Sequence, residues 1–67
     1  MKTGTIINGF KIVEAFGTSE LIEKMFNEAI GYIGVTGSIG VTMIECGSDE
    51  NGNIIEIAKV DVDRVRA

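Results

Sequence analysis

The sequence predicts an α+β domain of order ββαββ, in which one amphipathic helix packs on one face of a four-stranded antiparallel sheet. Apolar residues recur at helical spacing between Ser19 and Ile33, and the residues between them are largely charged or polar. Runs rich in β-branched residues flank Asn8–Gly9 and Asn51–Gly52, and Asn-Gly tolerates the positive φ angles of a tight hairpin turn. The 67 residues therefore make one small domain, residues 1–67, with two hairpins around a helix.

The first hairpin joins predicted strands at 3–7 and 10–16. A two-residue turn at Asn8–Gly9 places Ile7 beside Phe10 on one face of the antiparallel pair. The pattern leaves open whether the first strand pairs over its whole length.

The helix begins at Thr18 or Ser19, because either side chain can accept a hydrogen bond from the free N–H groups of the first turn. Acidic residues in that turn suit the positive end of the helix dipole. We expect the helix to end between Gly31 and Gly34, with Gly34 as a left-handed C-terminal cap and residues 35–38 as a loop. The apolar stripe consists of Leu21, Ile22, Met25, Phe26, Ala29, Ile30 and Ile33.

The second hairpin begins with an alternating strand at 39–46, and a two-residue turn at Asn51–Gly52 fixes its register. In that register Met43 pairs with Val60 on a face that is lined entirely by apolar groups. This face is the one that we expect the helix to cover.

The same register leaves apolar residues on the reverse face, where Cys46 falls opposite Ile57 and Ser48 opposite Ile55. One helix can cover only one face of a four-stranded sheet, so we expect the reverse face to pack against a second subunit in a homodimer or larger oligomer. The alternative is a β-bulge near Ala58 that turns all of these residues toward a single core. The predicted oligomer interface consists of Ile44, Cys46, Ile55 and Ile57, with a solvated rim of Lys59, Asp61 and Asp63.

The composition argues against several classes of function. A net charge of −4 opposes direct binding of nucleic acid, which needs clustered Lys and Arg. With no His and with Cys46 as the single cysteine, we expect no metal, no cofactor, no internal disulfide and no catalytic site. The sequence shows no signal-peptide pattern and no unbroken apolar run long enough to span a membrane, so we expect a cytoplasmic protein without a membrane partner.

Residues 34–40 contain three glycines and two hydroxyl side chains, a composition that permits close backbone approach to an anion or nucleotide. This segment follows a helix, whereas phosphate-binding loops precede one, and it lacks the Lys of a Walker A motif. The candidate ligand-binding residues are Tyr32, Thr36, Gly37 and Ser38.

The order of a strand, Gly17–Thr18–Ser19, a helix and a long antiparallel hairpin resembles the dodecins, which are small flavin-binding homo-oligomers. The resemblance implies a flavin site between subunits. The chain has no Trp for the flavin-stacking position of that family, so no residue role is carried over.

Charge and shape without a reactive group of residues predict a non-enzymatic small acidic interaction protein. We expect a homo-oligomeric regulator or inhibitor that acts by binding a protein partner. The alternative is a homo-oligomeric protein that binds an anion, nucleotide or flavin at sites between subunits.

Overall fold

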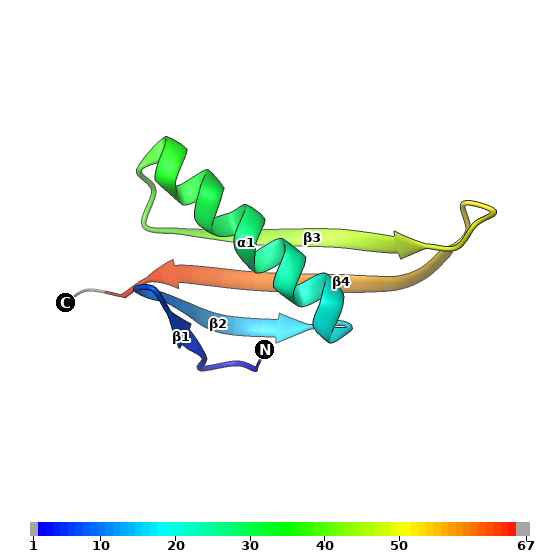
Figure 1. Ribbon diagram of the computed structural model, residues 1–67, viewed down its shortest axis with the longest axis horizontal. Helices are drawn as coiled ribbons and strands as arrows, with labels where there is room; N and C mark the ends of the chain where they lie inside the picture. The colour runs from blue at the N-terminus through cyan, green and yellow to red at the C-terminus, as the bar shows by residue number, and fades with distance from the viewer. Residues whose placement is uncertain (1, 66–67) are drawn as a thin grey trace.

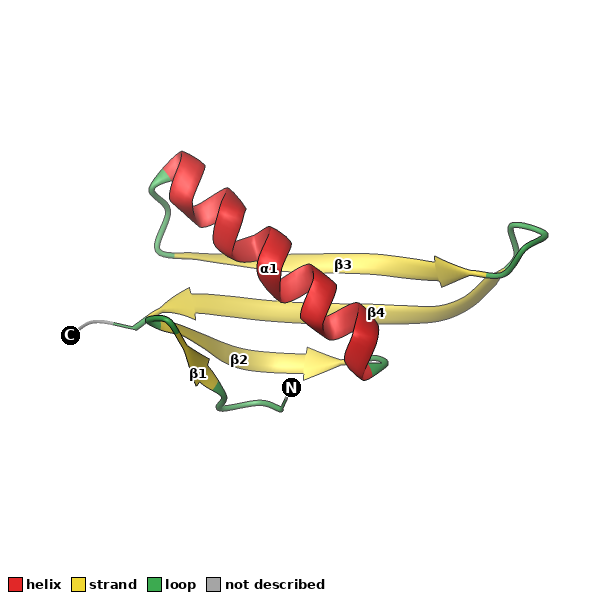
Figure 2. Cartoon of the chain, in the orientation of Figure 1, coloured by secondary structure: helices red, strands yellow, loops and turns green. Residues whose placement is uncertain are grey.

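The computed structural model describes residues 2–65 and has two layers, a four-stranded antiparallel sheet and one helix that crosses a single face of it diagonally (Figure 1). The strands are β1 (Ile6–Ile7), β2 (Phe10–Phe16), β3 (Gly40–Ser48) and β4 (Ile54–Arg64), and the helix is α1 (Ser19–Thr36). Their order along the chain is ββαββ, and their order in the sheet is β1-β2-β4-β3. The predicted fold class is therefore confirmed, with β4 inside the sheet and β3 at one edge (Figure 2).

The first hairpin closes at Asn8–Gly9 as predicted, and both residues have positive φ, 53° and 84°. Ile7 lies opposite Phe10 in the observed register. Strand β1 is only two residues long and is shorter than the predicted strand at 3–7. The reason is local, because the Thr5 N–H turns away from β2 and donates to the Lys2 carbonyl at 3.0 Å.

The second hairpin keeps the predicted register over most of its length. Met43 pairs with Val60 and Cys46 pairs with Ile57. Ala58 lies inside this uninterrupted register, so the alternative of a bulge near Ala58 is wrong. The two faces of β3 and β4 therefore stay distinct, one toward α1 and one away from it.

The turn of the second hairpin is longer than predicted. The Asp49 N–H donates to the Asn53 carbonyl at 3.0 Å, and the Asp49 carboxylate accepts the Asn53 N–H at 3.0 Å. These contacts close a loop at 49–53 instead of a two-residue turn. The register shifts just before Ser48, which lies opposite Ile54 and not opposite Ile55 as the sequence predicted.

Helix α1 begins as predicted, since Thr18 Oγ1 accepts an N–H of the first turn at 3.4 Å. Its predicted end at Gly34 is wrong. Gly34 keeps helical geometry in open space, at a cost of about 1 kcal/mol relative to Ala, so residues 35–36 are helical. The left-handed cap is Gly37, with φ 72° and with its N–H donating to the Ile33 carbonyl at 2.8 Å.

The hydrophobic core lies between α1 and the facing side of β2 and β4. Among residues 2–65 no polar or charged side chain is buried. Five of the seven predicted stripe residues are fully buried, which accounts for the helix position. The core consists of Ile12, Ile22, Met25, Phe26, Ala29, Ile33, Ala58, Val60 and Val62.

Gly17 joins β2 to the helix at a point where its backbone lies close to Ala58 of β4. Its φ is 128°, a value that side chains disfavour, and a Cβ there would lie 2.6 Å from Ala58 Cβ. The glycine therefore lets the start of α1 pack directly against β4.

Gly17→Ala should lower the free energy of unfolding by about 1–3 kcal/mol, because the methyl group must displace the β4 backbone. Gly34→Ala is the matched control and should raise it by about 1 kcal/mol, since the new methyl group meets open space on a helix. Urea unfolding followed by circular dichroism at one protein concentration measures both. Equal effects of the two substitutions would contradict the close packing at Gly17.

Candidate functional site

The face of the sheet opposite α1, called here the reverse face, carries a cluster of exposed apolar side chains. Ile44 and Ile55 are each 68% exposed, Ile57 is 56% exposed, and Cys46 is exposed. Cys46 and Ile57 are direct cross-strand partners, which sets both side chains on the same face. The structure therefore brings the four predicted interface residues together on one surface.

Phe16 extends this cluster across the sheet, and the sequence analysis missed it. It pairs with Lys59 on β4, whose other neighbour is Ile44 on β3, and its side chain is 49% exposed. The β2–β4 register that places Phe16 here contains a bulge at Val13, which local alternation does not reveal. The apolar patch consists of Phe16, Ile44, Cys46, Ile55 and Ile57.

Charged and polar groups border the patch on its side toward the chain termini. Lys59 Nζ lies 3.5 Å from Glu14 Oε2, and the Thr42 hydroxyl donates to Asp61 Oδ1 at 3.1 Å. Asp63 follows at the next position of β4 on the same face. Asp61 and Asp63 of the predicted rim thus lie beside the apolar patch, whereas Lys59 lies between Phe16 and Ile44 within it.

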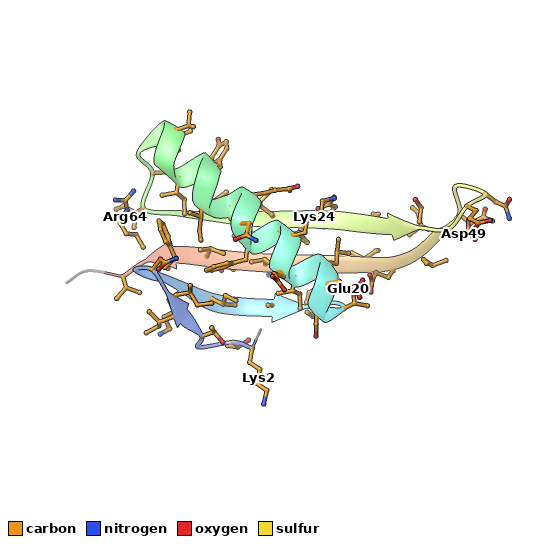
Figure 3. All side chains as sticks on the ribbon, viewed as in Figure 1. Lys2, Glu20, Lys24, Asp49 and Arg64 are labelled. Carbon is orange, nitrogen blue, oxygen red and sulfur yellow. The ribbon has the colours of Figure 1, made fainter. Side chains whose placement is uncertain are left out.

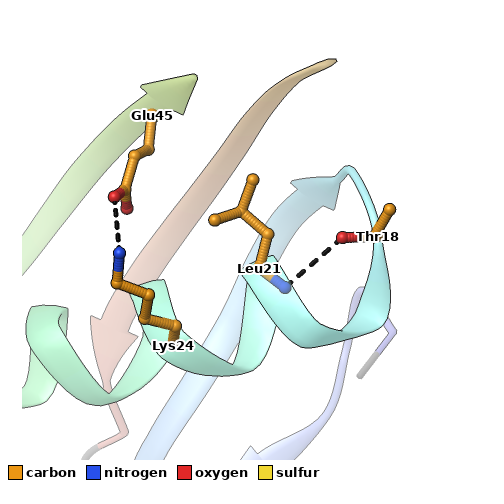
Figure 4. A network of polar contacts seen from close by, with 4 residues as sticks. All are labelled: Thr18, Leu21, Lys24 and Glu45. Atoms are coloured by element: carbon orange, nitrogen blue, oxygen red, sulfur yellow. Dashed lines mark hydrogen bonds and ion pairs between the residues drawn. The ribbon is translucent and has the colours of Figure 1, made fainter. Parts of the chain in front are cut away.

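On the helix side of the sheet, Lys24 Nζ of α1 forms an ion pair with Glu45 Oε1 of β3 at 2.9 Å (Figure 4). Glu45 accepts a hydrogen bond from the ammonium and raises the pKa of Lys24 above 10.5, and the charges of Glu45 and Glu28 add to the effect. Both side chains are partly exposed, so the pair fixes position more than it stabilises the fold.

An open depression of about 280 Å³ lies between the start of α1 and the β3–β4 hairpin. Thr18 Oγ1 donates to Glu56 Oε1 at 3.0 Å across its floor. Its ionisable groups are two carboxylates and one ammonium, which offer no metal-binding set and no activated nucleophile. Its lining residues are Thr18, Glu20, Leu21, Lys24, Gly47 and Glu56.

The four candidate ligand residues lie together at the C-terminal end of α1, but their polar groups bind one another. Thr36 Oγ1 donates to the Tyr32 carbonyl at 2.9 Å and lies 2.9 Å from the Ser38 hydroxyl. The Ser38 N–H donates to Thr36 Oγ1, and the Gly37 N–H caps the helix. Because the C-terminal end of a helix carries negative partial charge, this geometry does not favour an anion.

Within residues 2–65 no group of three His, Cys, Asp or Glu side chains is placed to hold a metal ion, and Cys46 is a free thiol. No helix in this part of the chain combines the length and the apolar character needed to cross a membrane.

Comparison with known proteins gave no match: no protein-family model, no curated protein and no solved structure is significantly similar to the chain. The resemblance to the dodecins stays a prediction from a tripeptide and the order of elements.

The raised pKa of Lys24 predicts a pH dependence of stability. The folded state holds this proton more tightly than the unfolded chain, so the contribution is fully present below the unfolded pKa and is lost as pH rises through the folded pKa, above 10.5. Wild type should therefore be slightly more stable than Lys24→Gln at pH 7, and the difference should shrink as the pH rises through the pKa of Lys24 and should also shrink in high salt.

Urea unfolding of the two proteins across this pH range is the measurement. Lys2→Gln is the control, because Lys2 forms no ion pair with residues 2–65 and should show no such dependence. A difference that stays unchanged as the pH rises through the pKa of Lys24 would mean that Lys24 stabilises the fold through packing alone.

Proposed function

We propose that this chain is a non-enzymatic interaction protein, a small acidic regulator or inhibitor that assembles with itself and acts by occupying the surface of a partner protein. The observation that supports this proposal is the exposed apolar patch on the reverse face. Exposed clusters of large apolar side chains often mark protein contacts, and charged groups beside such a cluster are typical of the edge of a contact.

The size of the reverse face suits a stable contact. The Cα atoms extend over 44 × 23 Å in the two long directions, which outlines a face of roughly 1,000 Å², and stable interfaces bury about 800 Å² per partner. Burial of one Ile or Phe side chain contributes about 1.5–3 kcal/mol, whereas association costs about 4–15 kcal/mol. Phe16, Ile44, Ile55 and Ile57 are 49–68% exposed, so each contributes roughly half of that amount, and the four from each of two copies contribute a total comparable to the cost.

The charge of the chain and its free thiol bear on the partner and the compartment. The net charge of −4 favours a basic protein surface over nucleic acid. The proposal places the protein in the cytoplasm, where an exposed free Cys46 stays reduced. The geometry favours this function over small-ligand binding, because the hydroxyls of Thr36 and Ser38 already bind within the chain.

Ile57→Lys should dissociate the homo-oligomer that uses the reverse face, because burial of an unpaired ammonium costs several kcal/mol. Asn27→Lys is the matched control, since it adds the same charge at an exposed position of α1 and should leave assembly unchanged. Sedimentation equilibrium at micromolar concentrations measures the mass, and circular dichroism checks the fold. Identical masses for Ile57→Lys and wild type would remove the reverse face as a self-association surface.

A pull-down from lysate with the full chain as bait should recover one protein partner at low salt, and less of it at moderate salt if a basic surface is bound. Ile55→Lys should lose the partner, and Asn27→Lys should retain it. Recovery of the bait alone at both salt concentrations would count against a regulator or inhibitor.

A further inference from the structure

The two edges of the sheet differ in how well they are protected against pairing with another strand. The β1 edge is only two residues long, and β2 behind it carries a bulge at Val13. The β3 edge is nine residues long and contains no Pro, Lys or Arg. Its one charged side chain, Glu45, is already bound to Lys24. Soluble proteins ordinarily shorten, bend or charge a free edge, and β3 shows none of these devices over most of its length.

The backbone groups that β3 presents to the outside can be assigned. The Ile39 carbonyl accepts the Arg64 N–H at 2.8 Å, so Ile39 faces β4. Antiparallel residues alternate between facing the partner strand and facing away from it. The N–H and C=O groups of Thr42, Ile44 and Cys46 therefore point away from β4, along the free edge.

We propose that this edge pairs antiparallel with the β3 edge of a second copy of the chain, about a two-fold axis perpendicular to the sheet, to form a continuous eight-stranded sheet. A register centred on Ile44 pairs all nine residues of β3. Glu45 of one copy then lies opposite Met43 of the other, and no like charges are directly opposite.

The shape of the chain is self-complementary about such an axis. The C-terminal end of α1 projects past the β3 edge near the start of the strand, and the β3–β4 hairpin projects past α1 near the end of the strand (Figure 1). We call residues 47–54 the arm. Figure 3 shows Asp49 at the tip of this arm and Glu20 at the N-terminal end of α1. A two-fold rotation at the middle of β3 lays the helix end of each copy over the arm of the other.

Exposed apolar side chains lie at the helix end. Val35 is 88% exposed and Tyr32 is 55% exposed at the C-terminal end of α1. Ile54 on the arm is 65% exposed and pairs with Ser48, so its side chain lies on the reverse face and not under the helix end of the second copy. A two-stranded hairpin alone is marginally stable in water, so contact with the helix end of the second copy stabilises the arm.

The assembly closes at two copies along this edge. An isologous contact uses the β3 edge of each copy once, and the short β1 edge is not a suitable acceptor for a further strand. This pairing goes beyond the proposed function, since it needs neither the partner protein nor the reverse face.

The test is amide hydrogen exchange of the full chain, measured by NMR at high micromolar concentration and again after dilution. The outward amides of Thr42, Ile44 and Cys46 should be protected to within about tenfold of the inward amides of Met43 and Glu45. Their protection should fall on dilution, together with the sedimentation mass. Fast exchange of the three outward amides alongside protected inward ones, at a concentration where the chain is dimeric, would overturn the edge pairing.

A matched pair of variants supports the measurement. Thr42→Pro removes an outward N–H from the β3 edge at a residue outside the apolar patch and should raise the dimer dissociation constant about 100-fold or more, because a symmetric contact loses two hydrogen bonds. Ile6→Pro is the control on the opposite edge. The Thr5 carbonyl accepts the Ile12 N–H at 2.9 Å, so Thr5 faces β2 and the N–H of the next residue, Ile6, points away from it. Loss of this outward N–H should leave dimerisation unchanged.

The outcomes separate this inference from the proposed function. Ile57→Lys should break a reverse-face contact and leave the outward amides protected, whereas Thr42→Pro should expose those of Ile44 and Cys46. If circular dichroism shows that Thr42→Pro is unfolded, the exchange pattern of the wild-type chain decides alone. Dimers that dissociate with Ile57→Lys and also exchange fast at Thr42, Ile44 and Cys46 would place all self-association on the reverse face and reject the edge pairing.

Discussion

One amphipathic helix can shield only one face of a sheet, and most features of this chain depend on that constraint. The helix buries five apolar side chains against the sheet, and the facing side of β4 supplies Ala58, Val60 and Val62. The residues between these on β4 must then point the other way, so Ile57 and Lys59 meet solvent. The reverse face is thus a direct consequence of the core, and its apolar content is what distinguishes this chain from a sheet with one wet face.

The diagonal path of the helix produces the second feature. Strand β4 is eleven residues long, and the helix crosses it toward the β3 edge instead of running along it (Figure 2). One end of the helix therefore extends beyond the sheet edge, and one end of the hairpin extends beyond the helix. Each overhang exposes apolar side chains, Val35 on the helix and Ile54 on the arm. The close approach at Gly17 fixes where this crossing begins.

Sequence reasoning succeeded where a pattern is local and failed where distant contacts decide. The pairing of Met43 with Val60 could be predicted because alternation with one apolar face allows a single register. The helix end could not, because Gly34 and Gly37 look alike in sequence and only the surroundings show that Gly34 is tolerated in open space. Phe16 joins the candidate site through a bulged pairing with β4, more than 40 residues away, and the Lys24–Glu45 pair depends on the helix crossing angle. The predicted two-residue turn at Asn51–Gly52 is wrong because the Asp49 carboxylate accepts the N–H groups of Asn51 and Asn53 and closes a longer loop.

The two proposed contact surfaces are physically linked at Ile44. Its side chain belongs to the apolar patch of the reverse face, and its N–H and C=O belong to the free β3 edge. Pairing of two edges about the proposed axis sets the Ile44 side chains of both copies next to each other and joins two patches into one wider surface. A partner with a two-fold or repeated surface could then engage both halves at once, and the second contact would form at high effective concentration. Pairing along the β3 edge would in this way strengthen binding of the partner to the reverse face, without any new contact between the partner and each copy.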